Sequence, residues 1–257
     1  MRTTKEGKKK KLRGKGRKIK IRKNDFFGKK IFLLLLNMVL PLQFLSSRDI
    51  DPCGFEHLTQ VFTKLAHDAI PSIVKIAVLK SGGFSSDTFK NQVFYGSGFL
   101  VSKEGYIITC GHVIENATKI SVYFKNQEVE ALLIQLNSEI DIAVLKIDGT
   151  NFPFLTLGDS DVTNIGEWVV SIGYPFSLRP FVASGIVGAK DELGTALFLD
   201  ILICQGNSGG PLLNLKGEVI GISSALFQSH QELRGVGVAI PINQIKNHVL
   251  WLLSGDS

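Results

Sequence analysis

Apolar residues recur at helical spacing near the start of the body of this chain. Residues 54–70 read GFEHLTQVFTKLAHDAI, and Pro71 ends the pattern. The apolar positions in this stretch are Phe55, Leu58, Val61, Phe62, Leu65 and Ala69. Recurrence every three or four residues predicts an amphipathic helix over 54–70.

Short runs of β-branched and aromatic residues follow Pro71 and predict strands, with Gly, Asn, Lys or Glu between them. A polar stretch, residues 147–166, divides these runs into two groups. The expected strands are 72–79, 93–101, 106–109, 119–124 and 129–136 before this stretch, and 167–173, 181–189, 196–203, 210–214, 218–226 and 235–242 after it.

A second helical pattern closes the chain in INQIKNHVLWLL, residues 242–253, directly after Pro241. Helices do not alternate with the strands, as they would in a parallel α/β fold. Many short strands at close spacing indicate antiparallel barrels or sandwiches. We therefore expect an all-β fold with one helix before it and one after it.

The charge of the chain is divided very unevenly. Residues 1–30 hold 15 of the 29 Lys and Arg residues and two of the 23 acidic residues, a local net charge of +13. The remaining 14 basic and 21 acidic residues give the rest of the chain a net charge of −7. Since basic residues are not spread over the folded part, we expect no nucleic-acid binding by it.

The basic stretch is followed by an apolar run, IFLLLLNMVLPLQFL, at residues 31–45 and then by Ser46 and Ser47. The run is shorter than the roughly 20 residues of a membrane-spanning helix. A basic run, a short apolar run and small residues are typical of a secretory signal. We expect residues 1–47 to be an export leader and 48–257 the functional domain. Retention as a membrane tether or as a nucleic-acid anchor, and a mitochondrial address, are the alternatives.

Three cysteines, Cys53, Cys110 and Cys204, are too few and too far apart for a disulfide framework or a zinc site. We expect free thiols, no bound metal and no cofactor.

The stretch CQGNSGGPLL, residues 204–213, brackets one serine with three glycines. Glycine clusters mark turns that other residues cannot make. The stretch is either a tight loop or a nucleophile, Ser208, on a turn whose backbone N–H groups face a developing oxyanion. Its formal match to the G-x-S-x-G elbow of α/β-hydrolases fails, because a strand follows it and only His230 and His248 come later in the chain.

A serine nucleophile needs an imidazole base and an acid that orients the imidazole. His112 directly follows a predicted strand and Cys110-Gly111, whereas His57 and His67 lie on the first predicted helix, where structural roles suit them. Asp141 enters a very apolar strand in SEIDIAVLKI. A carboxylate at the edge of a core needs a partner, and a histidine N–H is a natural one.

The order His112, Asp141, Ser208 is that of chymotrypsin-like serine proteases, and the chain most resembles their HtrA/Deg branch. The resemblance covers about residues 55–247. The matching pieces, in order, are GSGFLVSKEGYIITCGHVI, DIAVLKI, LGDSDVTNIGEWVVSIGYPFSL, GNSGGPLLNLKGEVIGI and GVGVAIPI.

The resemblance implies a chymotrypsin-like double β-barrel, with one barrel over about 72–147 and the other over about 167–242. It implies a triad of His112, Asp141 and Ser208 and an oxyanion hole formed by the N–H groups of Gly206 and Ser208. Leu202, six residues before the nucleophile, and Asn207 are assigned to the substrate pocket.

An apolar pocket implies cleavage of unfolded or damaged proteins after small aliphatic residues. The resemblance further implies a homotrimer, and no PDZ domain is expected after GVGVAIPI.

The sequence departs from the family pattern at two places. Cys110 stands where the family has Asn, and the polar stretch before the nucleophile reads FLDILICQ and keeps only Asp200 clearly. The second expected function is therefore a protease-like binding module that holds misfolded chains without cutting them.

Overall fold

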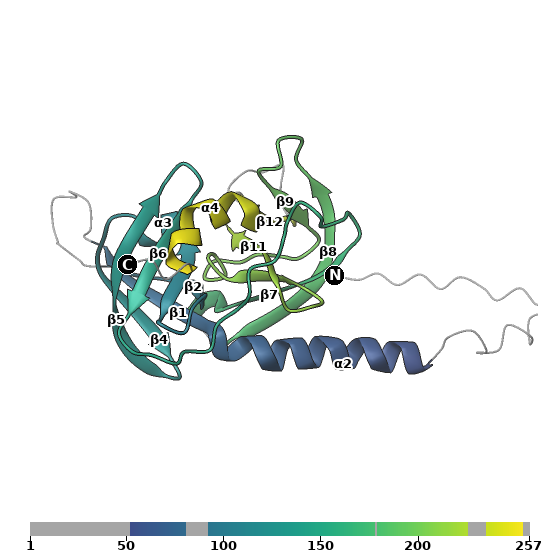
Figure 1. The fold of residues 1–257 in the computed structure, drawn as a ribbon, viewed down its shortest axis with the longest axis horizontal. Coiled ribbons are helices and arrows are strands. Elements are labelled where there is room, and N and C mark those ends of the chain that lie inside the picture. Colours follow the sequence, from purple (N-terminus) through teal and green to yellow (C-terminus); the bar gives the residue numbers. More distant parts are fainter. Residues whose placement is uncertain (1–51, 81–91, 178, 226–234, 254–257) are drawn as a thin grey trace, which may run out of the picture. The chain divides into compact units, whose positions relative to one another are not determined.

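The fold is seen in a computed structural model that describes residues 52–80, 92–177, 179–225 and 235–253 (Figure 1). The leader expected over 1–47, with its apolar run at 31–45, lies outside these residues. Among the described helices, none is both long and apolar enough to cross a membrane.

The first barrel closes from six antiparallel strands in the order β1-β2-β3-β6-β5-β4. These are β1 (Ile73–Lys80), β2 (Gln92–Leu100), β3 (Tyr106–Cys110), β4 (Ala117–Phe124), β5 (Gln127–Asn137) and β6 (Ile142–Ile147). A one-turn helix that the sequence pattern did not predict, α3 (Gly111–Ile114), continues directly from β3.

The second barrel closes in the order β10-β11-β12-β9-β8-β7. Its strands are β7 (Trp168–Gly173), β8 (Phe181–Lys190), β9 (Leu197–Leu199), β10 (Pro211–Asn214), β11 (Val219–Ser224) and β12 (Gly237–Pro241), with the short helix η2 (Pro175–Ser177) between β7 and β8. Two closed antiparallel barrels confirm the expected all-β, chymotrypsin-like fold class.

Two longer helices flank the barrels: α2 (Pro52–Ala69), followed by the short η1 (Ile70–Ser72), and α4 (Ile242–Leu253). The apolar face of α2 places Leu65 and Ala69 in the core, and Phe62 packs edge-on against Trp168 of the second barrel. On α4, Ile242, Ile245 and Val249 are buried. The apolar stripes that predict these helices are thus the faces that the barrels bury.

One predicted strand is shorter than the sequence suggests. The apolar run at 196–203 pairs only over Leu197–Leu199, because Asp200 ends the ladder. The carboxylate of Asp200 accepts the N–H of Ile186 at 2.6 Å. If β9 continued, a backbone carbonyl of β9 would accept this N–H instead. The chain is thereby released from the sheet and turns toward the glycine-rich motif.

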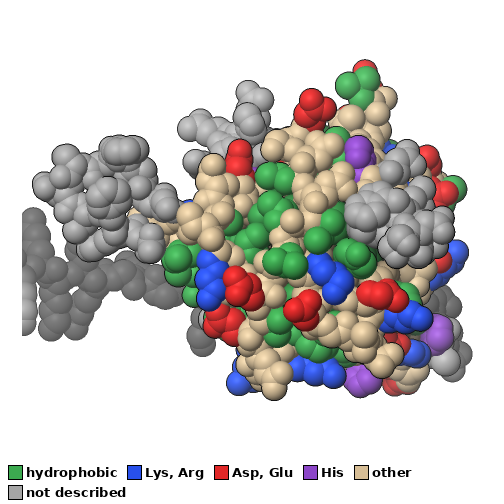
Figure 2. All heavy atoms as spheres, turned by 60° about the vertical axis from the view of Figure 1, so that its left-hand side comes forward, with side chains coloured by type: hydrophobic (Ala, Val, Ile, Leu, Met, Phe, Trp, Pro, Cys, Tyr) green, Lys and Arg blue, Asp and Glu red, His purple; other side chains and the backbone are tan. Residues whose placement is uncertain are grey.

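The outer face of the first barrel carries charges of both signs. In Figure 2, which turns this side forward, lysines and acids are interspersed among apolar side chains. The exposed apolar residues of β5 are Leu132, Leu133, Ile134 and Leu136. The described residues of this face do not form the continuous positive surface that nucleic-acid binding requires.

Candidate active site

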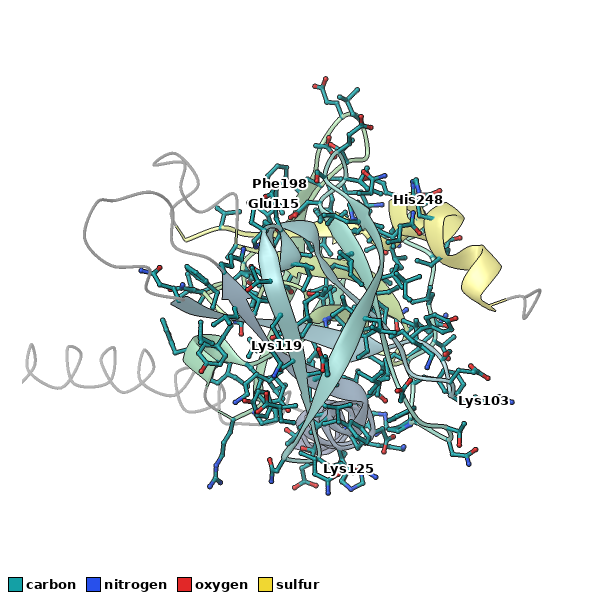
Figure 3. All side chains as sticks on the ribbon, turned by 90° about the vertical axis from the view of Figure 1, so that its left-hand side faces the viewer. Lys103, Glu115, Lys119, Lys125, Phe198 and His248 are labelled. Carbon is teal, nitrogen blue, oxygen red and sulfur yellow. The ribbon has the colours of Figure 1, made fainter. Side chains whose placement is uncertain are left out.

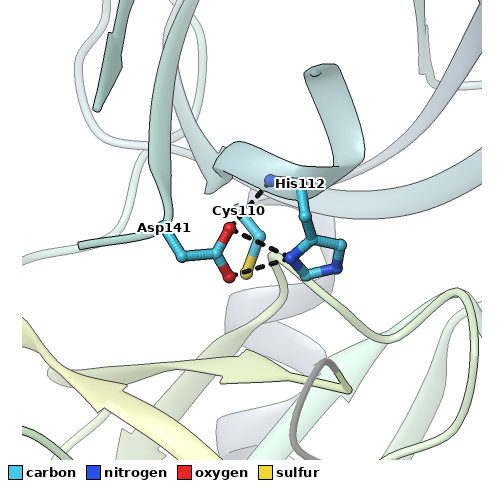
Figure 4. Close-up of side chains that lie close together, drawn as sticks. All are labelled: Cys110, His112 and Asp141. Atoms are coloured by element: carbon cyan, nitrogen blue, oxygen red, sulfur yellow. Dashed lines mark hydrogen bonds and ion pairs between the residues drawn. The ribbon is translucent and has the colours of Figure 1, made fainter. Parts of the chain in front are cut away.

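Pairing of β3 with β6 brings His112 and Asp141 together. Cys110 at the end of β3 faces Ile142 at the start of β6, so the residues just beyond these strand ends are neighbours. The Nδ1 atom of His112 lies 2.8 Å from Oδ2 and 3.0 Å from Oδ1 of Asp141 (Figure 4). A carboxylate only accepts hydrogen bonds, so Nδ1 carries a proton, and in the neutral imidazole Nε2 is then the acceptor.

The carboxylate of Asp141 is held in place from several sides. Its Oδ1 also accepts the backbone N–H of His112 at 2.7 Å, and its Oδ2 accepts the hydroxyl of Ser224 at 3.4 Å. Asp141 has a φ of 53°, a left-handed conformation that Asp and Asn tolerate better than most residues. The local backbone therefore aims the carboxylate at the imidazole.

Cys110 is fully buried beside this pair (Figure 4). Burial, with the negative charge of Asp141 second, raises the pKa of the Cys110 thiol well above its ordinary value. The neutral thiol donates a weak hydrogen bond to the carbonyl of Ser223 at 3.4 Å. Its sulfur and the ligand atoms of His112 and Asp141 lie within 4.8 Å of one another, so a metal ion there would occupy the atoms that orient the imidazole.

Ser208 sits on a tight turn packed against the first barrel. Its carbonyl accepts the N–H of Ser97 at 2.8 Å, and its Oγ accepts the N–H of Ala225 at 3.0 Å. A methyl group on Gly209 would lie 2.2 Å from the hydroxyl of Thr109 and the carbonyl of Ser97, so only glycine allows this approach. The turn therefore lies against Thr109 and Cys110 at the end of β3, two to three residues before His112.

Ser224 and Ala225 connect the two halves of the site. Ser224 donates to Asp141, and its neighbour Ala225 donates to Ser208. Two consecutive residues at the end of β11 therefore contact both the acid and the serine. The sequence pattern gave no sign of them, because this contact arises only from the docking of the two barrels.

The geometry of the glycine turn leaves two N–H groups available. Among the described residues, no hydrogen bond uses the N–H of Gly206 or of Ser208, whereas the N–H groups of Asn207, Gly209 and Gly210 all donate to backbone carbonyls. Two free donors on alternate residues of one turn are what an oxyanion hole needs.

Bonds to the carbonyls of the same peptide units fix the direction of these two N–H groups. In a trans peptide the N–H points opposite to the carbonyl. The carbonyl of Gln205, which shares a peptide with the Gly206 nitrogen, accepts the N–H of Phe176 at 3.0 Å. The carbonyl of Asn207, which shares a peptide with the Ser208 nitrogen, accepts the N–H of Gly210 at 3.0 Å.

Ser97 and Tyr174 form a second support that the sequence pattern missed. The hydroxyl of Ser97 donates to the carbonyl of Gly206 at 2.6 Å and accepts the N–H of Tyr174 at 2.8 Å. Gly206 has a φ of +96°, and a methyl group there would lie 2.4 Å from the carbonyl of Tyr174. The turn is therefore clasped between β2 and the segment that follows β7.

The two residues assigned to the substrate pocket differ in environment. Leu202 is 57% exposed, between the buried Ile201 and Ile203. Asn207 is buried, and its Oδ1 has no hydrogen-bond partner among the described residues. The described side chains do not enclose Leu202, so its role at the base of a substrate pocket stays a prediction.

Comparison of the sequence with known proteins identifies the kind of domain that this chain carries. The family model of the trypsin-like peptidase domain matches residues 96–222, which include His112, Asp141 and Ser208. A probable periplasmic serine endoprotease DegP-like from Halomonas elongata is 36% identical over 251 residues, covering 82% of this chain and 52% of that protein.

Proteins with the same name from Pseudomonas putida and Chlamydia trachomatis are 43% and 41% identical over 155 and 167 residues. These alignments cover 32% and 34% of the two relatives, so this chain spans about half the length of the relatives or less. The chain therefore carries a trypsin-like peptidase domain that is similar to the matching part of the DegP-like serine endoproteases, which confirms the HtrA/Deg resemblance of its motifs.

Proposed function

We propose that this protein is a serine endopeptidase in which Ser208 is the nucleophile, His112 the general base and Asp141 the acid that orients it. The observation that supports this proposal is the arrangement of the bonded His112 and Asp141 side chains and of the glycine turn that carries Ser208. The carboxylate of Asp141, whose Oδ2 lies 2.8 Å from Nδ1 of His112, holds the imidazole in the tautomer whose Nε2 can accept a proton. A glycine turn presents Ser208 and two N–H groups that no hydrogen bond among the described residues uses.

In the proposed reaction, Nε2 of His112 takes the proton of Ser208 as Oγ attacks the carbonyl carbon of the scissile bond. The N–H groups of Gly206 and Ser208 stabilise the negative charge that develops on the carbonyl oxygen. His112 then protonates the leaving amine, and water releases the acyl group by the reverse sequence. No metal or cofactor takes part in this proposal.

The proposed substrates are unfolded or damaged proteins, cut after small aliphatic residues. Leu202 and its neighbours, residues 201–203, carry no charge. The nearest acid along the chain, Asp200, is engaged by the N–H of Ile186, and burying a substrate cation without a partner costs several kcal/mol. Aliphatic residues are mostly hidden in folded cores, which favours unfolded chains as substrates.

The names of the relatives support an extracytoplasmic location, since they are called periplasmic. An export leader at residues 1–47 fits this location. A homotrimer and a tether through residues 31–45 remain predictions from the family resemblance and from the leader.

The test compares cleavage of reduced, unfolded casein with that of a folded globular protein, and maps the products by mass spectrometry. We expect faster loss of the unfolded substrate, with most cuts after Val, Ala, Ile or Leu, and no cuts by Ser208→Ala. A majority of cuts after Lys or Arg would refute the pocket. Undiminished binding of casein by a wild-type protein that never cuts it would favour the binding module instead.

A further inference from the structure

A buried thiol beside the proposed triad takes no part in the proposed reaction. Cys110 ends β3, two residues before His112, and is fully buried. Its sulfur, a ring nitrogen of His112 and a carboxylate oxygen of Asp141 all lie within 4.8 Å of one another. Figure 4 shows Nδ1 of His112 turned toward the carboxylate and the sulfur, and Nε2 turned away from them. Thiolate, imidazole and carboxylate are the side-chain groups that bind zinc in proteins.

The separations of these three atoms suit a zinc ion. Atoms within 4.8 Å of one another share a central point no more than about 2.8 Å from each, and zinc bonds to such atoms are about 2.0–2.3 Å long. Inward shifts of about half an ångström would therefore complete three bonds. Pairing of Cys110 with Ile142, the residue after Asp141, already holds the two chain segments side by side.

The charges of the three groups also suit a divalent ion. A thiolate and a carboxylate with a neutral imidazole exactly balance two positive charges, and a neutral cluster is the form that a partly buried site favours. The side chains of His112 and Asp141 are only 25% and 17% exposed. Burial raises the pKa of the Cys110 thiol, but a coordinating thiol is deprotonated outright by the ion. The sulfur disfavours Mg²⁺ and Ca²⁺, which prefer oxygen ligands.

This cluster stands alone within the described part of the chain, where no other three such groups lie as close together. Glu115, the acid nearest to His112 along the chain, is exposed just after α3, and His248 lies on α4 (Figure 3). His67 contacts Asp68 on the exposed side of α2, without a cysteine beside them. A zinc ion with a sulfur ligand is therefore expected at Cys110.

We propose that Cys110, His112 and Asp141 form a binding site for Zn²⁺ and that the bound ion switches the neighbouring Ser208 off. The ligands are Sγ of Cys110, Nδ1 of His112 and a carboxylate oxygen of Asp141. Water fills the fourth position of the tetrahedron from the exposed side of His112. The inhibitory half of the proposal rests on the proposed peptidase function, and the binding half does not.

The ion inhibits by changing the tautomer of His112. Without metal, Nδ1 carries the proton and lies 2.8 Å from Oδ2 of Asp141. Once zinc is bonded to Nδ1, the single proton of the neutral imidazole is on Nε2, which then donates and cannot accept the proton of Ser208. The thiol proton leaves to water, so each bound ion releases one proton. Since the ion does not touch the proposed substrate pocket, kcat falls while KM is unchanged.

Binding is tested first, on the wild-type protein, by X-ray absorption at the zinc edge. We expect one sulfur neighbour at about 2.3 Å. Co²⁺ in place of zinc should give the charge-transfer band of a thiolate bonded to cobalt. Cys110→Ser, which keeps the size of the side chain but replaces the sulfur, should lose this band. Cys204→Ser removes the second free thiol of the described residues and is the matched control, which should keep the band.

Inhibition is tested next with a short neutral peptide substrate, and each protein is compared with its own metal-free activity. We expect Zn²⁺ to lower the kcat of the wild type and of Cys204→Ser without changing KM, and a chelator to restore it. Mg²⁺ at the same concentration should have no effect. Cys110→Ser should need at least about tenfold more Zn²⁺ for the same inhibition, because even loss of an outer-shell partner weakens metal binding this much.

The outcomes separate the two halves of the proposal. A zinc spectrum without sulfur, a cobalt band that survives Cys110→Ser, or equal inhibition of Cys110→Ser and the wild type would overturn the site. The spectrum of the wild type decides this even if Cys110→Ser does not fold. Binding through Cys110 with kcat unchanged would overturn the inhibition. An inactive protein that still binds zinc through Cys110 would refute the peptidase proposal and leave the metal site intact.

Discussion

At the scale of single residues, the proposed site depends on backbone conformations that few side chains allow. Gly206 combines a φ of +96° with the carbonyl of Tyr174 at 2.4 Å from where a methyl group would stand. Asp141, at a φ of 53°, uses the same region of backbone space to face His112. Both conformations are supported by hydrogen bonds from neighbouring segments, which offset their intrinsic cost.

Gly206→Ala should therefore lower kcat/KM by about 10²-fold or more, since loss of one oxyanion donor has about this effect. The added methyl group has to displace Tyr174 or turn the peptide. Gly217→Ala is the matched control, because Gly217 has a φ of +82° but nothing within 4 Å of the added methyl group. It should lose only about 1–2 kcal/mol of stability and keep its activity. Equal activity losses in both variants would contradict the role of Gly206.

Asp141→Asn should lower kcat by about 10⁴-fold, because an amide can hold the imidazole in the wrong tautomer. Asparagine tolerates a positive φ as well as aspartate does, so the thermal midpoint should change little. Steady-state kinetics and thermal unfolding of the same preparation check both statements. The exposed Asp159→Asn serves as the control. Wild-type kcat in Asp141→Asn would remove Asp141 from the proposed triad.

At the scale of elements, the residues of the proposed site lie at or just beyond the ends of strands, and the segment 174–176 holds the glycine turn in place. β3 and β6 supply the histidine and the acid, while β2 and the segment after β7 clasp the glycine turn through Ser97. Ser97 does not belong to the proposed chemistry. It satisfies one buried carbonyl and one N–H at once, and we regard it as a positioning residue.

Ser97→Ala should cost about 1–3 kcal/mol of stability, because both partners lose their hydrogen bond. It should also lower kcat more than it changes KM, since the oxyanion peptide loses a support and the substrate-binding surface does not. Ser102→Ala, which removes another buried hydroxyl, one that accepts the N–H of Glu104 at 3.3 Å far from the glycine turn in the sequence, is the control. A loss of stability with kcat unchanged would show that Ser97 is structural only.

The helices and most strands could be predicted from the sequence, because each element buries one face at its own period. His112, Asp141 and Ser208 could be predicted as a set from their order and their local motifs. Ser97, Tyr174 and Ser224 could not, because their partners lie between 77 and 109 residues away along the chain. The end of β9 was missed because Asp200 bonds to Ile186 of β8, a contact that the local apolar pattern does not show.

At the scale of the whole molecule, the site lies where the two barrels meet. One continuous core includes Ile108 and Val144 of the first barrel and Ile172 and Ile222 of the second. Hydrogen bonds from Ser97 to Ser208 and from Ser224 to Asp141 cross the same boundary. Neither barrel alone holds all three residues of the proposed triad, so the proposed chemistry requires both barrels in their mutual arrangement.

The most direct test of this account is covalent labelling with a fluorophosphonate, which reacts only with an activated serine. We expect the protein to gain one label, located on Ser208 by mass spectrometry of the digested protein. His112→Ala and Ser208→Ala should gain none, while unfolding in urea should abolish labelling of the wild type. Labelling of another serine, or a folded wild-type protein that takes up no label, would contradict the claim that Ser208 is the nucleophile of a serine endopeptidase.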